Sequence, residues 1–185
     1  MEQRWSRRLL VTLTTAGTLL AGYASTAEAA PVSALDSQVA QVMAAVPGGV
    51  RTAPNQISWK NGHVVLTLAA PSATAAKAAA VPATSGTGAC GSNFWCLYEN
   101  ANFNQGLFND GRMLSLTGCD GIPGNLTNYG FNDKTSSWFN NSGFSPVNVY
   151  RDINGGGGIL WTMHAFERSS YVGDSNNDKA SSINC

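Results

Sequence analysis

Two nearly identical stretches, NDKTSSW at Asn132–Trp138 and NDKASSI at Asn177–Ile183, lie 45 positions apart in this chain. Each combines an amide, a carboxylate, two intervening residues and a pair of hydroxyls. A single copy is ordinary turn chemistry, because Asn, Asp and Ser side chains readily bond the backbone of a turn. Two copies in equivalent surroundings indicate a repeated structural unit with a shared use for these oxygen atoms.

The segments in front of the two stretches support the repeat. CLYENANFNQG, from Cys96, aligns with NVYRDINGGGG, from Asn148, and each precedes a strand pattern and then an NDK stretch. Short apolar runs alternate with turn residues throughout residues 90–185, which is typical of an antiparallel β-sandwich. These runs are FWCLYE, RMLSL, SSWFNN, VNVYRD and GILWTM. We expect no helix longer than a turn or two in this part.

The repeat resembles the microbial βγ-crystallins, in which an aromatic residue and a glycine precede an Asn/Asp-Asn/Asp-x-x-Ser/Thr-Ser stretch. The resemblance implies an all-β, βγ-crystallin-like double Greek-key sandwich, with keys at about 90–142 and 143–185. Tyr150 and Gly157 keep the family spacing. The first key has Gln105 in place of the glycine, so we expect a bulge in its hairpin.

Calcium binding is the chemistry that these oxygen atoms favour. Ca²⁺ takes roughly six to eight oxygen ligands, and one NDK loop offers a carboxylate, a backbone carbonyl and a hydroxyl. The resemblance implies that a hairpin carbonyl of the opposite key completes each site. One predicted site therefore contains Asn177, Asp178, the Lys179 carbonyl, Ser181 and the Glu99 hairpin. The other contains Asn132, Asp133, the Lys134 carbonyl, Ser136 and the Arg151 hairpin.

The two predicted sites differ in charge. Arg151 stands where the family has an acidic residue, and a cation beside calcium is unfavourable. We therefore expect the first-key loop to make the weaker site, with affinities of about 10–1000 μM. The last serines, Ser137 and Ser182, are assigned to bonding the hairpin backbone. The alternative is that both loops are turns without a metal.

Two regions at the start of the chain have separate signatures. Residues 1–29 combine arginines, a short apolar stretch and Ala27-Glu28-Ala29, which predicts a cleaved export signal of the Sec or twin-arginine type and a secreted protein. Residues 30–68 predict a helix capped by Asp36 and a hairpin turning at Asn61-Gly62. Such a segment is too small to be stable alone, so it either docks on the rest of the chain or serves as a pro-segment.

Residues 69–89, rich in Ala, Thr and Pro, predict a flexible linker, with a short Ala-rich helix as the alternative. After residue 29, eight of the 11 Lys and Arg and nine of the 11 Asp and Glu remain, a net charge of −1. Nucleic acids and anionic membranes require clustered positive charge. We therefore expect neither as a partner, and we expect a monomer.

The four cysteines predict two disulfides, because a zinc site would require closer Cys pairs with nearby histidines. Cys96 and Cys119 are symmetric about position 107.5, inside the first predicted turn. This predicts a Cys96–Cys119 bridge across that hairpin and a Cys90–Cys185 bridge between the ends of the domain.

No catalytic signature accompanies His164, the only histidine of residues 90–185, so we expect no enzymatic activity. The export signal, the Ala-rich linker and the C…CLYE opening at 90–99 resemble the secreted actinomycete metalloproteinase inhibitor family. That family implies a rigid loop held in a protease cleft, beside a cysteine for which this chain has no counterpart between Cys119 and Cys185. Two hypotheses follow: a secreted proteinase inhibitor with a calcium scaffold, or a calcium-stabilised extracellular module without a protease target.

Overall fold

The structure is a computed structural model that describes residues 33–69, 90–105, 110–118, 124–143 and 146–185. The predicted export signal and nearly all of the predicted linker lie outside these residues. No helix within the described ranges is long and apolar enough to span a lipid bilayer.

The described residues form one helix at the start and eleven strands, with short helical turns between some of them. The bounds are α1 Ala34–Ala45, β1 Val50–Ala53, β2 Gln56–Trp59, η1 Lys60–Gly62, β3 Val64–Thr67, β4 Phe94–Tyr98, α2 Ala101–Asn104, β5 Met113–Leu116, β6 Gly124–Asn125, η3 Leu126–Tyr129, β7 Ser137–Asn141, β8 Val147–Tyr150, η4 Ile153–Gly155, β9 Ile159–Met163, β10 Arg168–Ser169 and β11 Ser182–Asn184. The five apolar runs of the repeat are all strands, as predicted.

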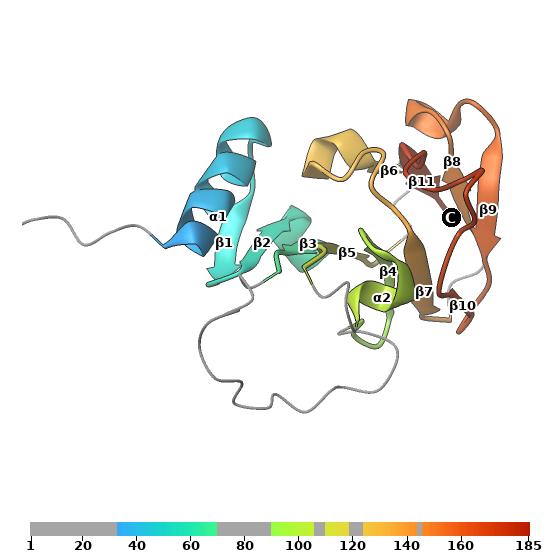
Figure 1. Cartoon of the computed structure of the whole chain (residues 1–185), viewed down its shortest axis with the longest axis horizontal. Helices are drawn as coiled ribbons and strands as arrows, with labels where there is room; N and C mark the ends of the chain where they lie inside the picture. Colours follow the sequence, from blue (N-terminus) through green and yellow to red (C-terminus); the bar gives the residue numbers. More distant parts are fainter. Residues whose placement is uncertain (1–32, 70–89, 106–109, 119–123, 144–145) are drawn as a thin grey trace, which may run out of the picture. The chain divides into compact units, whose positions relative to one another are not determined.

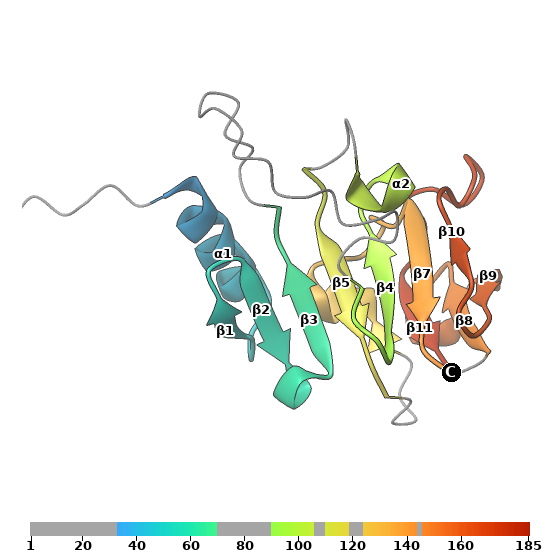
Figure 2. The same ribbon diagram turned by 90° about the horizontal axis from the view of Figure 1, so that it is seen from below.

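The strands form two antiparallel sheets, in the orders β1-β2-β3-β5-β4-β7-β10 and β6-β11-β8-β9 (Figures 1 and 2). The first key supplies β4 to β7 and the second key supplies β8 to β11. In each key the third strand, β6 or β10, pairs in the sheet of the other key. This exchange of third strands confirms the predicted βγ-crystallin-like double Greek key.

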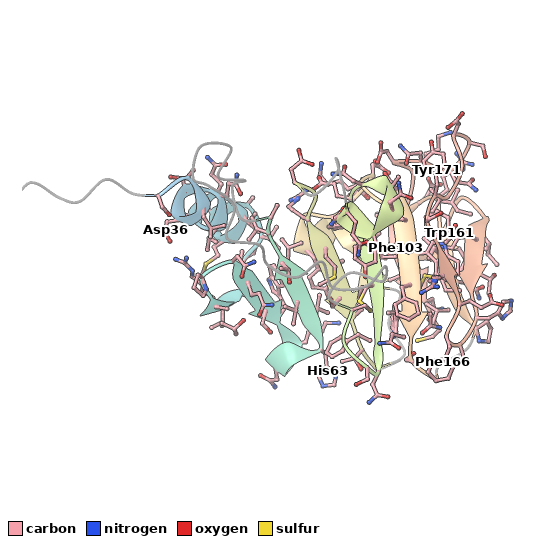
Figure 3. All side chains as sticks on the ribbon, turned by 60° about the horizontal axis from the view of Figure 1, so that its bottom comes forward. Asp36, His63, Phe103, Trp161, Phe166 and Tyr171 are labelled. Carbon is pink, nitrogen blue, oxygen red and sulfur yellow. A yellow bond between two sulfur atoms is a disulfide. The ribbon has the colours of Figure 1, made fainter. Side chains whose placement is uncertain are left out.

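The core lies between the two sheets, because alternate residues of each strand point inward. Trp95 and Leu97 of β4 pair with Leu116 and Leu114 of β5, and all four are buried. Tyr98 lies on the opposite face in a smaller cluster, where its ring packs edge-on against Phe103 at 5.5 Å between centroids. Phe103 is labelled in Figure 3.

The N-terminal segment docks on the first key, one of the two alternatives that the sequence left open. Strand β3 pairs with β5 over four residues, so the β1–β3 strands extend the larger sheet. Val39 and Val46, in and just after α1, are buried in the same core cluster as Trp95 and Ile183. The Trp59 ring also packs edge-on against Tyr129 of the first key, with centroids 5.5 Å apart.

The start of α1 differs from the prediction. The N-cap is Ser33, whose Oγ accepts a hydrogen bond from the Asp36 backbone N–H at 3.0 Å. Asp36, labelled in Figure 3, lies in the first turn, and its carboxylate accepts from Arg51 at 2.6 Å. An acid in the first turn still favours the helix, because it complements the positive end of the helix dipole.

The predicted disulfides are wrong. Cys90 is bonded to Cys96, with 5.8 Å between their Cα atoms, and Cys185 is also disulfide-bonded. Cys119 lies outside the described residues. The physical reason is the strand register: Cys96 pairs opposite Ser115. A hairpin centred at 107.5 would place Leu97 opposite Gly118 and lose its apolar pairing with Leu114.

Replacing Trp59 with Ala tests whether the N-terminal segment is part of the common core. Trp59 is 5% exposed, so we expect a loss of about 3–5 kcal/mol in the free energy of unfolding. Denaturant unfolding should remain a single cooperative transition. Val50→Ala, at a position 63% exposed, is the control and should change stability by less than about 0.5 kcal/mol. Two separate transitions in the wild type would contradict this packing.

Candidate cation-binding site

Each NDK loop is fastened to the hairpin of its own key by the last serine of the motif. The Ser137 Oγ donates to the Asn100 carbonyl at 2.7 Å and accepts from the Phe103 N–H at 3.0 Å. The Ser182 Oγ donates to the Asp152 carbonyl at 2.5 Å and accepts from the Gly155 N–H at 2.9 Å. The predicted structural role of Ser137 and Ser182 is therefore confirmed.

The two hairpins share an unusual backbone conformation. Asn102 and Phe103 have φ of 52° and 60°, and their counterparts Asn154 and Gly155 have φ of 57° and 74°. Left-handed conformations are unfavourable for bulky residues such as Phe, so the serine bonds hold the first hairpin in a strained shape. Strands β4 and β5 pair without a register shift, and the first hairpin beyond Gln105 lies outside the described residues.

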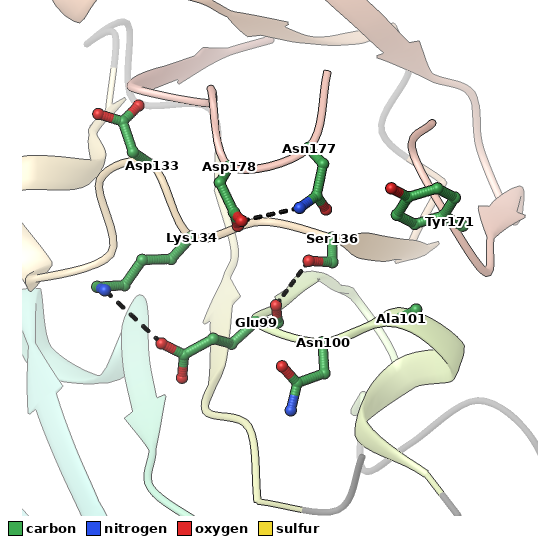
Figure 4. A pocket seen from close by; sticks show the side chains of 9 residues that line it. All are labelled: Glu99, Asn100, Ala101, Asp133, Lys134, Ser136, Tyr171, Asn177 and Asp178. Atoms are coloured by element: carbon green, nitrogen blue, oxygen red, sulfur yellow. Dashed lines mark hydrogen bonds and ion pairs between the residues drawn. The ribbon is translucent and has the colours of Figure 1, made fainter. Parts of the chain in front are cut away.

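Ser136, which directly precedes Ser137, places its hydroxyl beside a carbonyl of the hairpin. We call this place the first corner and define it by Glu99, Ser136 and Asp178. The Ser136 Oγ donates to the Glu99 carbonyl at 2.7 Å, and the Ser136 N–H donates to the Tyr98 carbonyl at 2.9 Å. The Asp178 carboxylate enters the same pocket from the second key (Figure 4). The pocket has a volume of about 390 Å³ and is lined by Glu99, Asn100, Ala101, Asp133, Lys134, Ser136, Tyr171, Asn177 and Asp178.

The second corner is defined by Arg151, Ser181 and Asp133. The Ser181 N–H donates to the Tyr150 carbonyl at 2.9 Å, immediately before Arg151, and the Ser181 Oγ donates to the Asp133 carboxylate at 3.3 Å. The Asp133 carboxylate points away from Glu99 in Figure 4. Each corner therefore takes its hydroxyl from one key and its carboxylate from the other.

This arrangement corrects the predicted pairing of whole loops with opposite hairpins. Ser136 lies against the Glu99 hairpin rather than the Arg151 hairpin, and Ser181 lies beside the second-key hairpin rather than Glu99. The serines immediately precede β7 and β11, which pair with β4 and β8 of the same key, so they reach only their own hairpins. The prediction that the Asp178 loop faces Glu99 agrees with the pocket lining.

Asp133 and Asp178 each reach the corner of the opposite key because of the backbone conformation of their loops. Asp133 and Asp178 have φ of 52° and 53°, a left-handed conformation that Asp tolerates better than most residues. The two loops also bond each other: the Asp133 N–H donates to the Ala180 carbonyl at 2.9 Å, and the Asp178 N–H donates to the Thr135 carbonyl at 3.3 Å. Each acid is thereby placed at the border between the keys.

Glu99 supplies a backbone carbonyl to the first corner, because its side chain is occupied elsewhere. The Arg112 guanidinium donates to both Glu99 carboxylate oxygens, at 2.9 and 3.0 Å, and the Arg112 backbone N–H adds a third bond at 3.0 Å. Burial raises the pKa of Glu99, but these bonds and the Arg112 charge outweigh it and hold the pKa below its ordinary value. Sequence reasoning missed Arg112, although a correct β4–β5 register would have placed it opposite Glu99.

Asp178 carries the opposite shift. Burial raises the pKa of Asp178, and the nearby carboxylates of Glu99 and Asp133 raise it further against the lowering effect of Lys134. An ionised Asp178 therefore destabilises the folded protein, and a cation in the first corner would relieve that cost.

The donor set suits a hard cation that accepts mixed oxygen ligands. The Asn132 and Asn177 side chains each donate to the neighbouring aspartate, at 2.7 and 2.8 Å, while their Oδ1 atoms are buried without a hydrogen-bond partner. Such orphaned acceptors at equivalent positions are what a bound cation or its hydration shell can satisfy. Within the described residues no three His, Cys, Asp or Glu side chains converge as metal ligands. Carbonyl and hydroxyl oxygens would have to complete any site, which matches the preference of Ca²⁺ and not that of Zn²⁺.

Fold and corners together define a two-key βγ-crystallin-like domain with a cation-compatible border between its keys. Residues 83–163 match the model of peptidase inhibitor family I36, so this part of the chain is similar to that inhibitor family. The match ends with β9, before the second NDK loop, and covers less than half of the 185 residues. No curated protein sequence matches the chain.

Solved βγ-crystallin structures resemble part of the chain. A structure concerning the evolution of the eye lens βγ-crystallin domain fold is 22% identical, covers 54% of this chain and 89% of its own, and has a TM-score of 0.39. A βγ-crystallin domain from Clostridium beijerinckii is 27% identical over 49% of this chain and 94% of its own, with a TM-score of 0.37. A double mutant of that domain is 29% identical over 50% and 96%, with a TM-score of 0.38.

Replacing Arg112 with Met tests how the Glu99 hairpin is held. A carboxyl group whose pKa is lowered by folding stabilises the protein at a pH above its ordinary pKa of 4.5. This stabilisation is lost as the pH falls through the lowered pKa of the folded state. We expect Arg112→Met to lower the free energy of unfolding by about 1.5–3 kcal/mol at pH 7. The loss should shrink on acidification, measured by denaturant unfolding between about pH 3 and 7.

Arg168→Met, which changes an exposed arginine of β10, is the control and should leave both the stability and its pH dependence nearly unchanged. An Arg112→Met variant with the pH profile of the wild type would show that the Glu99 bond contributes nothing to the fold.

Proposed function

We propose that the domain binds calcium at the border between its two keys. The observation that carries this proposal is the meeting of the Ser136 hydroxyl, the Glu99 carbonyl and the Asp178 carboxylate in one pocket, with an acid whose ionisation is disfavoured in the metal-free protein. Bound calcium would supply the positive charge that favours ionised Asp178. Because the acid and the hydroxyl come from different keys, binding would also stabilise their association.

The first corner is the stronger of the two candidate sites. Arg151 begins the hairpin beside Ser181, so in sequence position it belongs to the second corner. Asp133 lies in the corner of the opposite key. We therefore expect the weaker site at the corner that Ser181 and Asp133 form. Affinities of about 10–1000 μM remain our expectation, because such values are usual for extracellular calcium modules.

We further propose that the protein acts outside the cell as a proteinase inhibitor with calcium as its scaffold. The family match over residues 83–163 and the export signal predicted at residues 1–29 support this activity and location. Its partner would be a secreted protease. The rival proposal is a calcium-stabilised extracellular module without a protease target, which the lack of any cysteine between Cys119 and Cys185 favours.

Asp178→Asn tests the first corner in two opposite directions. The folded pKa of Asp178 is raised, so its ionisation lowers stability at neutral pH, and the penalty fades as the pH falls below the folded value. We therefore expect Asp178→Asn to melt at a higher temperature than the wild type in chelator and to lose its calcium response at this corner. Thermal melts and isothermal titration with calcium measure the two effects.

Asp133→Asn is the matched variant, because it changes the equivalent acid of the other loop. It should retain the stronger calcium-binding event. For the wild type, calcium at about 100 times its dissociation constant should stabilise the fold by about 2.7 kcal/mol. Absence of both heat and a melting shift in 10 mM calcium, a concentration about tenfold above the weakest expected Kd, would refute calcium binding.

Protease titration separates the two proposals for biological activity. The protein, with and without calcium, is added to a thermolysin-like and to a subtilisin-like protease, and residual activity is measured. A proteinase inhibitor should reduce the activity of at least one of them at micromolar protein. Full activity of both enzymes, with the inhibitor candidate intact by electrophoresis, would favour the module without a protease target.

A further inference from the structure

The first corner already contains a positive charge that the protein itself supplies. Lys134 lines the pocket together with Asp178, and its Nζ lies 3.8 Å from the Glu99 carboxylate (Figure 4). The side chain is 40% exposed, so it can turn into solvent without breaking the fold. At 3.8 Å the contact is a loose ion pair rather than a short hydrogen bond.

Glu99 does not require Lys134, because Arg112 already neutralises it. The Arg112 guanidinium bonds both oxygens of the Glu99 carboxylate. Among the residues that line the pocket Lys134 is the one cation, so its ammonium is the positive charge available to balance Asp178 and Asp133. Lys134 shares the pocket with the acids of both NDK loops as well as with Glu99.

The equivalent lysine of the second key behaves differently. The Lys179 Nζ donates to the Ser175 carbonyl at 2.7 Å, within its own loop. Lys134 and Lys179 occupy the same motif position, yet only Lys134 is among the residues that line the described pocket. The difference therefore follows from the surroundings and not from the motif.

We propose that Lys134 is a built-in counter-cation of the first corner, which stabilises the metal-free protein and competes with calcium for the same negative field. This inference rests on the proposed calcium binding. Calcium and the ammonium of Lys134 would repel each other inside one pocket, so binding requires Lys134 to turn outward. Lys134 thereby lowers the calcium affinity of the corner and lessens the instability of the domain when calcium is scarce.

The test compares Lys134→Met with Lys179→Met in the full chain. We expect Lys134→Met to bind calcium roughly three- to tenfold more tightly than the wild type by isothermal titration, because one repelling unit charge is removed from a partly screened site. In chelator the same variant should melt at a lower temperature than the wild type, since the acids of the pocket lose the one cation among its lining residues. Lys179→Met should change neither value appreciably, and Lys134→Arg should keep the wild-type affinity.

The outcomes separate this inference from the function on which it rests. A wild type that gives no calcium signal refutes the proposed calcium site. A wild type that binds calcium, with Lys134→Met no tighter than Lys179→Met, overturns the role of Lys134. Lys134→Gln is made in parallel, and the variant that folds decides the result if the other one does not.

Discussion

One buried serine hydroxyl in each key ties the NDK loop to the folded hairpin of the same key. Ser137 and Ser182 are fully buried, and each satisfies one hairpin N–H and one hairpin carbonyl. The bonds of Ser137 help to hold the left-handed turn at Asn102–Phe103, together with the bond from the Asn102 N–H to the Ser170 carbonyl at 2.8 Å. The position of that turn sets the Glu99 carbonyl, and the adjacent Ser136 meets it only because the loop enters β7 in a fixed register.

The negative charges at the border between the keys are incompletely balanced, and this follows from the arrangement of both loops and not from a single residue. Two aspartates cross from opposite keys, and the cations nearest them are either committed, as Arg112 is to Glu99, or loosely held, as Lys134 is. Under the calcium binding proposed above, such a border would trade stability of the metal-free fold for a response to the ion. Arg112 belongs to this balance because it bonds both oxygens of the Glu99 carboxylate, while the Glu99 carbonyl accepts from the Ser136 hydroxyl.

The sequence was sufficient for features that depend on local pattern and insufficient for those that depend on register. Strand positions, the repeat and the buried serines follow from alternation and spacing, and all are confirmed. The predicted disulfide partner of Cys96 was wrong because moving the centre of the hairpin by two residues leaves the alternation of inward and outward side chains unchanged. That alternation has a period of two, so it cannot reveal such a shift. The crossing of Asp133 and Asp178 depends on left-handed backbone at single residues, and the docking of β3 on β5 depends on contacts between distant segments.

The exchange of β6 and β10 between the sheets has a consequence for how such a domain can arise. Each key lends a strand to its neighbour, so one key alone would lack a strand in its sheet and expose the edge beside it. A single-key ancestor would have had to pair with another copy of itself and trade that strand reciprocally. The connectivity of the present chain is thus that of two keys that exchange one strand each and are joined end to end.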